Sequence, residues 1–149
     1  NEFIQDEPKL NKNIFITTDR EDRISNINEV KEFLLKNNFE IIVPNKYEII
    51  DLLRLIKSSS ILISEKASVF NNVLLIRNKK YFLLSSESEN NLDTRLFAGA
   101  GIYKEFNRGL FNEILFRDDP LIQNVKAYKK RIKVDINKLS SIITNNETY

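Results

Sequence analysis

The sequence predicts an α/β domain built on a Rossmann-like parallel sheet flanked by helices. Short apolar runs rich in β-branched residues recur along the first half of the chain, and amphipathic helical patterns separate them. The runs are apolar throughout, as is typical of strands that are buried on both faces of a parallel sheet. Right-handed crossovers between such strands give a Rossmann-like arrangement.

The first predicted unit is a strand at residues 13–17, a charged turn at 18–23 and a helix. Three apolar residues of this helix recur at helical spacing: Ile27, Val30 and Leu34. Asn26, followed three residues later by Glu29, matches a capping box that would open the helix. Strand, turn and helix in this order form the first half of a βαβ unit.

The second predicted unit repeats this order. A strand at residues 39–43 is closed by Pro44, and Asn45 with Glu48 is a second candidate capping box. Four residues then make one apolar helical face: Ile49, Leu52, Leu53 and Ile56. We expect this helix to end in the serines at 58–60.

The later elements follow from the same patterns. They are a strand at 61–63, a polar turn at 64–66, a short helix carrying apolar residues at 69–73, a strand at 81–84, a polar loop at 85–91, a helix at 94–100, a strand at 113–116, a basic strand at 129–134 and a closing helix at 135–143. The closing helix is expected to turn Ile136, Leu139 and Ile143 inward.

Length and composition fit one domain. The chain has 149 residues, of which 42% are apolar and 30% charged, as is ordinary for a globular protein. We expect residues 1–12 to be a linker or tail and residues 13–149 to be the domain. No apolar run reaches the roughly 20 residues that span a bilayer, and no secretion leader is recognised. Because the chain contains no Met and begins with Asn1, we interpret it as a piece of a longer protein or as a chain whose start has been removed.

Composition also removes several kinds of site. Without Cys there is no disulfide or thiolate metal site, and without His there is no Ser-His-Asp or Cys-His triad. The net charge of +2 does not indicate a nucleic-acid partner. Gly99 and Gly101 lack the third glycine of a dinucleotide fingerprint, and Asp118 with Asp119 before Pro120 is typical of a turn rather than a metal site. The lysines and arginine between 126 and 133 fit a solvated edge strand better than a phosphate or membrane contact.

Candidate binding residues lie where the predicted strands end. Ligands of an open parallel sheet bind beyond the carboxyl ends of its strands, where loops 17–23, 44–47, 64–68 and 85–91 are expected to converge. Arg20 and Arg23 carry guanidinium forks suited to a diphosphate. In the alternative interpretation both are solvated and pair with nearby acidic residues, namely Asp19, Glu21 or Asp22.

The other loops add complementary groups. Ser64 and Ser68 flank the start of a helix whose amide groups are suited to an anion. Tyr47 is suited to stack on a base. These loops therefore predict a site for a phosphate-bearing ligand at one edge of the sheet.

Residues 14–85 carry a resemblance to a known family. Arg20, Arg23, Asn28 and Glu29 fit an Arg-bearing turn followed by an Arg-x-(I/L)-x-Asn-Glu-like segment, and residues 38–44 fit a strand motif that ends in proline. Residues 65–71 (EKASVFN) stand where a His-Gly-Ala-(G/A)-Leu-x-Asn motif is found, and residues 132–139 look like a closing strand and helix. On these motifs the chain resembles the carboxyl-terminal domain of the family 61 glycosyltransferases, which include bacterial capsular polysaccharide biosynthesis proteins.

The resemblance implies one half of an enzyme with two Rossmann-like domains, of the GT-B type. This half would hold a nucleotide-sugar donor, and a missing amino-terminal domain would bind the glycan acceptor. The reaction would be glycosyl transfer in capsular or surface polysaccharide biosynthesis, with no cofactor and no obligatory metal. The implied location is the cytoplasm, with or without peripheral attachment to the inner face of the membrane.

The resemblance also assigns roles to residues. Glu65 would be the catalytic base, and the groups that contact the donor diphosphate would be Arg20, Arg23, Lys66 and Ser68. Tyr47 and Asn71 would contact the donor base or sugar. Glu65 and Lys66 replace the His-Gly pair of the family motif, so the alternative is a degenerate, non-catalytic Rossmann-like module with a binding or regulatory role. A phosphate-accepting receiver domain is a third reading, which fits less well because Asp19 and Asp22 lie among arginines.

Overall fold

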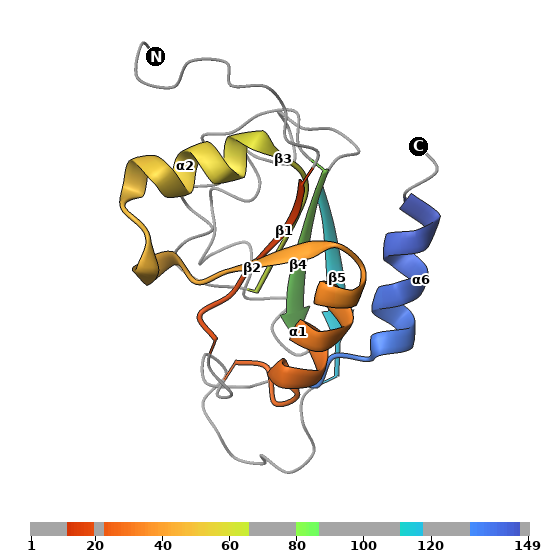
Figure 1. Cartoon of the computed structure of the whole chain (residues 1–149). Helices are drawn as coiled ribbons and strands as arrows, with labels where there is room; N and C mark the ends of the chain where they lie inside the picture. Colours follow the sequence, from red (N-terminus) through yellow and green to blue (C-terminus); the bar gives the residue numbers. More distant parts are fainter. Residues whose placement is uncertain (1–11, 20–22, 66–79, 87–110, 118–131, 147–149) are drawn as a thin grey trace.

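The computed structural model describes residues 12–19, 23–65, 80–86, 111–117 and 132–146 (Figure 1). The elements in chain order are β1 (Lys12–Ile16), α1 (Ile27–Lys36), β2 (Phe39–Ile42), the 3-10 helix η1 (Pro44–Lys46), α2 (Ile49–Ser58), β3 (Ser59–Glu65), β4 (Lys80–Ser86), β5 (Phe111–Phe116) and α6 (Ile136–Asn146). Segments predicted at 1–11, 69–73, 94–101, 118–120 and 126–131 lie outside the described residues.

The five described strands form one parallel sheet in the order β2-β1-β3-β4-β5. The chain moves outward from β1 to β2, and then crosses back over β1 to continue from β3 toward β5. This order is that of a flavodoxin-like, doubly wound sheet, whose direction of winding reverses between β1 and β3. The predicted α/β class with a Rossmann-like parallel sheet is confirmed.

Helices cover both faces of the sheet. Figure 1 shows α1 and α6 on one side and α2 on the other. Phe15, Ile63 and Phe82 of the central strands share one hydrophobic cluster with residues of α1 and α6, including Leu34 and Leu139. The neighbours of Phe15 in β1, Ile14 and Ile16, alternate to the opposite face, and all three are at most 1% exposed. Burial on both faces explains why these strands are apolar throughout.

The start of α1 differs from the prediction. The helix buries Ile27, Val30 and Leu34 as expected, but Asn26 makes no side-chain capping bond. Its side-chain amide instead pairs with the backbone of Val134: Nδ2 donates to the carbonyl oxygen at 2.8 Å, and Oδ1 accepts from the amide at 2.9 Å. The predicted capping box is wrong because a partner distant in the sequence has taken the side-chain oxygen that a cap needs.

The second capping box is wrong as well. Glu48, not Asn45, is the N-cap residue of α2, and it makes no side-chain capping bond. Asn45 lies within η1, which begins at Pro44, the residue that was expected to close the strand. In α2, Leu52 and Ile56 are buried, whereas Ile49 is 51% exposed. Only the later turns of α2 therefore pack closely on the sheet.

Two strands extend beyond the carboxyl ends that were predicted for them. β3 includes Ser64 and Glu65, which were expected in a polar turn, and β4 includes Ser85 and Ser86, which were expected in a loop. The ladder between β3 and β4 continues through the pair Glu65 and Leu84, so the backbone stays extended to the end of the apolar core. The predicted strand at 113–116 is confirmed within β5, and the closing helix is confirmed as α6.

The basic strand predicted at 129–134 is wrong in its described part. Ile132 makes only an isolated parallel bridge with Ile24, and residues 133–135 are coil. Lys133 is exposed, while Ile132 and Val134 are buried against the same core as α1. This segment therefore binds the end of the connection between β1 and α1 through backbone hydrogen bonds, and it does not extend the sheet.

Candidate functional site

The carboxyl ends of β1 and β3 meet at Glu65, the last residue of β3. The parallel register pairs Ile16 with Ser64, which brings Thr17 beside Glu65. This point lies between the two strands at which the winding of the sheet reverses. In open α/β sheets such a reversal opens the crevice in which ligands bind.

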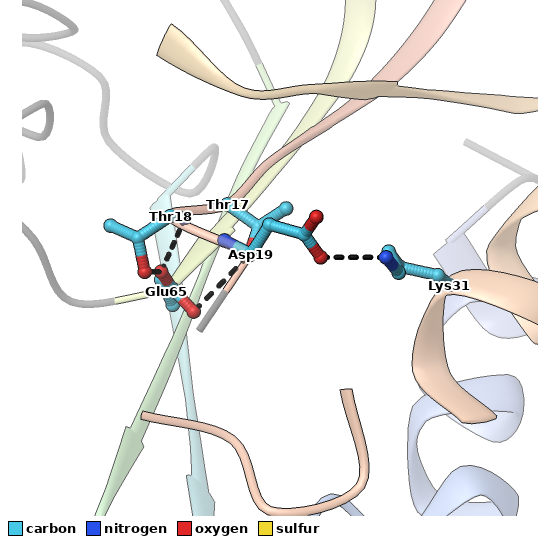
Figure 2. A network of polar contacts seen from close by, with 5 residues as sticks. All are labelled: Thr17, Thr18, Asp19, Lys31 and Glu65. Atoms are coloured by element: carbon cyan, nitrogen blue, oxygen red, sulfur yellow. Dashed lines mark hydrogen bonds and ion pairs between the residues drawn. The ribbon is translucent and has the colours of Figure 1, made fainter. Parts of the chain in front are cut away.

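Three donors from Thr17 and Thr18, directly after β1, converge on the carboxyl group of Glu65 (Figure 2). The backbone N–H of Thr18 donates to Oε1 at 2.6 Å, and the Thr18 hydroxyl donates to the same oxygen. The Thr17 hydroxyl donates to Oε2 at 3.3 Å. Glu65 is only 2% exposed, so a nearly dry acidic group holds the ends of the two strands together.

Burial raises the pKa of the Glu65 carboxyl above its ordinary value of 4.5. The hydrogen bonds from Thr18 and Thr17 and the positive charge of Arg23 act in the opposite direction, because they favour the ionised form. Desolvation is the largest of these effects. Ionisable groups whose pKa is displaced by burial and that sit in a crevice are typical of functional sites.

The turn after β1 is shaped by Asp19. Its backbone is left-handed, with φ of 56°, and its N–H donates to the Thr17 hydroxyl oxygen at 2.9 Å. Its carboxylate forms an ion pair with Lys31 of α1, at 2.6 Å between Oδ1 and Nζ (Figure 2). Asp19 therefore pairs with a lysine of α1, whereas one interpretation of the sequence paired it with the arginines of its own turn.

A second set of hydroxyl groups lies at the same edge of the sheet, on the face covered by α2. The hydroxyls of Ser64 and Tyr81 form a hydrogen bond inside the core. Ser85, near the end of β4, is 1% exposed, and its hydroxyl oxygen is without a hydrogen-bond partner, the one such buried side-chain atom among the described residues. Strand alternation places Ser64 and Ser85 on the opposite face from Glu65.

Three of the predicted site residues lie in the described part of the chain: Glu65, Arg23 and Tyr47. The charge of Arg23 acts on Glu65, and the backbone carbonyl of Arg23 is fixed by the N–H of Ile132 at 3.0 Å. Tyr47 comes directly after η1, the short helix that follows the edge strand β2, and it is 37% exposed. The remaining predicted site residues lie outside the described part of the chain: Arg20, Lys66, Ser68 and Asn71.

The threonine donors were not singled out from the sequence. Thr17 and Thr18 lie in a loop that was expected at the site, but their partner is set by the register of β1 against β3. The signal that could have identified them is a pair of hydroxyl residues directly after a buried strand. Likewise, Ser85 follows an apolar run and was assigned to a loop, although it is buried in β4.

Metal sites and membrane-spanning helices are absent from the residues that the structure describes. In these ranges no group of three or more acidic, His or Cys side chains is placed to hold a metal ion. Within the same ranges, no helix combines the length and apolar character needed to cross a membrane.

No protein-family model matches the chain, and no curated protein matches it either. The resemblance to family 61 glycosyltransferases thus stays a prediction.

Proposed function

We propose that this chain is the donor-binding half of a glycosyltransferase of the GT-B type, acting in capsular or surface polysaccharide biosynthesis. The observation that carries the proposal is Glu65, a buried acidic group with a raised pKa at the carboxyl ends of β1 and β3, where the winding of the sheet reverses. The positive charge of Arg23 favours the ionised form of that carboxyl group and is the smallest of the effects on its pKa. An acid and a guanidinium at the carboxyl edge suit a ligand that carries both a sugar and a diphosphate.

The proposed roles follow from the chemistry of these groups. A base that removes a proton from an acceptor hydroxyl works best when its pKa lies closer to neutrality than that of an ordinary carboxylate, and burial moves the pKa of Glu65 in this direction. The guanidinium of Arg23 would stabilise the charge that develops on the departing diphosphate. The glycan acceptor would come from a second domain, and the reaction would take place in the cytoplasm or at the inner face of the membrane.

The test is an NMR titration of the folded chain with UDP, GDP, CDP and their sugar conjugates. We expect saturable amide shifts at residues 17–19 and 64–65, which are lost in Arg23→Ala. Arg54→Ala is the matched control, because Arg54 is an exposed arginine of α2 that pairs with Asp51 at 3.6 Å. Flat spectra across the panel, or equal losses in both variants, would contradict the proposal.

A second candidate is a non-catalytic Rossmann-like module with a binding or regulatory role. It is favoured by the contacts of Glu65, since both carboxyl oxygens already accept bonds from Thr17 and Thr18 and the side chain is 2% exposed. In this case Glu65 links two strands and does no chemistry. Flat spectra for every nucleotide, together with a loss of stability in Glu65→Gln, would support this second function.

A further inference from the structure

The donors around Glu65 form what we call the β1 cradle: the backbone N–H of Thr18 and the hydroxyls of Thr17 and Thr18. All three point to one place beyond the end of β1. Their shared target is an acidic group with two oxygen atoms, and the positive charge of Arg23 acts on the same place. Backbone N–H groups, hydroxyls and an arginine are the groups with which proteins bind phosphate.

We infer that the β1 cradle is a phosphate site and that Glu65 is its internal occupant, which a phosphate-bearing ligand must displace. The two carboxyl oxygens of Glu65 stand in for two oxygens of a phosphate group. This inference rests on the proposed function, because the displacing group would be the diphosphate of the nucleotide-sugar donor. It adds a regulatory element to that function, since the empty protein blocks its own site.

The position of the cradle supports this assignment. It lies at the end of the strand that borders the reversal between β1 and β3, where doubly wound sheets receive their ligands. Two contacts that do not involve Glu65 hold the turn that carries the cradle. Lys31 forms an ion pair with Asp19, and the N–H of Asp19 donates a hydrogen bond to the Thr17 hydroxyl oxygen. The donors therefore keep their geometry when the acid leaves. One anion can replace another only if the donors stay in place while the site is empty, and these contacts meet that requirement.

Competition with Glu65 gives a distinctive prediction. In the wild-type protein a phosphate ion must both displace the acidic group and tolerate its negative charge nearby. Glu65→Gln removes that charge with little change of shape, and Glu65→Ala empties the cradle. We expect both variants to bind inorganic phosphate about tenfold more tightly than the wild type, because like charges at contact distance repel strongly near a protein surface.

The experiment is an NMR titration with inorganic phosphate at constant ionic strength, following the amide of Thr18. Asp51→Asn is the matched control, because it neutralises one exposed carboxylate of α2 and changes the net charge equally. Its affinity for phosphate should equal that of the wild type. Adding Thr18→Val to Glu65→Gln removes one hydroxyl donor and should reverse most of the gain. Equal affinity in the wild type and both Glu65 variants would overturn the inference.

A measurement on the unsubstituted protein covers the case in which the Glu65 variants do not fold. The side-chain carbon signal of Glu65 should move together with the Thr18 amide as phosphate reaches saturation. A Glu65 signal that stays fixed at high phosphate would overturn the inference. Inorganic phosphate contains no nucleoside, so the cradle is tested separately from the proposed function. Tight nucleotide binding without any effect of Glu65→Gln would leave the proposed function intact and remove only the cradle.

Discussion

The connection between β1 and α1 is held at its two ends by two different kinds of bond. At its start, Thr17 and Thr18 are bound by the buried acid of Glu65, which lies 47 residues after Thr18. At its end, the neutral amide of Asn26 pairs with both backbone groups of Val134, 108 residues away. We call the first the acid lock and the second the amide clamp. One depends on an ionisable group, and the other does not.

The surroundings of the two contacts differ as well. Beside the amide clamp, the N–H of Ser25 donates to the carbonyl of Ile132 at 2.9 Å, and Ile24 is fully buried. The clamp therefore belongs to the core shared by α1 and α6. The acid lock lies at the edge of the sheet, where its donors are also suited to a ligand. The comparison teaches that one end of this connection is built to be permanent and the other to be exchangeable.

The largest effect is expected at the amide clamp. Asn26→Ala removes both bonds to Val134 and leaves a partly buried N–H and carbonyl without partners. We expect the free energy of unfolding to fall by about 2–3 kcal/mol, by the same amount at every pH between 5 and 8. Urea unfolding measures this change.

Glu29→Gln is the control for the clamp, because the other contact of the Asn26 amide is an exposed hydrogen bond to Glu29 at 3.0 Å. This control should change the free energy of unfolding by less than about 0.5 kcal/mol. If Asn26→Ala proved as mild as Glu29→Gln, the clamp would not hold the connection and the contrast with the acid lock would disappear.

The acid lock should give an effect that depends on pH. The folded protein holds the proton of Glu65 more tightly than the unfolded chain, because burial raises the pKa of this carboxyl in the folded state. Its contribution to stability is therefore fully present below the unfolded pKa near 4.5, and it is lost as the pH rises through the folded pKa. Glu65→Gln cannot ionise, so the wild type should lose stability relative to this variant as the pH rises.

Urea unfolding of the wild type and Glu65→Gln between pH 4 and 8 checks the prediction. Asn26→Ala serves as the second reference, since it should keep the pH dependence of the wild type. A difference between the wild type and Glu65→Gln that is constant with pH, or that grows in favour of the wild type, would show that Glu65 is not desolvated as described.

The sequence predicted the layers of the fold because parallel strands buried on both faces leave a plain signal. Ile14, Phe15 and Ile16 are all buried, and a short apolar, β-branched run between amphipathic helices is typical of such a strand. The details at the helix starts were not predictable. Asn26 and Glu29 satisfy a local pattern, but Val134 claims the amide through a tertiary contact that a local pattern does not contain.

In the candidate site too, local patterns predicted some residues, and others depend on contacts between distant parts of the sequence. Arg23 was proposed from the rule that ligands bind beyond strand ends, whereas Glu65 was proposed from the family resemblance. The charge of Arg23 is the smallest of the effects on the pKa of Glu65. The donors of the β1 cradle were missed, because they depend on the register that sets Ile16 beside Ser64. Glu65 was placed in a polar turn with Ser64 and Lys66, but it lies in the buried strand β3. It is tolerated there because Thr17 and Thr18 bind both of its oxygens.

The smallest effect is expected where α1 touches the acid lock. Lys31→Met removes the ion pair with Asp19, whose side chains are 26% and 36% exposed. Partly solvated pairs of this kind contribute less than about 1 kcal/mol, and the contribution falls as salt is added. Lys12→Met is the control, because Lys12 forms a longer and more exposed pair with Glu40 at 3.5 Å. It should have a still smaller effect in urea unfolding at low and high salt.

The Lys31 variant tests whether the ion pair between Lys31 and Asp19 is needed to hold the turn of the acid lock. The left-handed turn at Asp19 is also held by its own N–H on the Thr17 hydroxyl oxygen, so it should survive without the ion pair. The Thr18 amide signal should then stay in place in Lys31→Met. A loss above about 2 kcal/mol, with a shifted Thr18 amide, would mean that α1 holds the lock directly. In that case displacement of Glu65 would also change the position of α1, because Asp19 and Lys31 would link the acid lock to the helix.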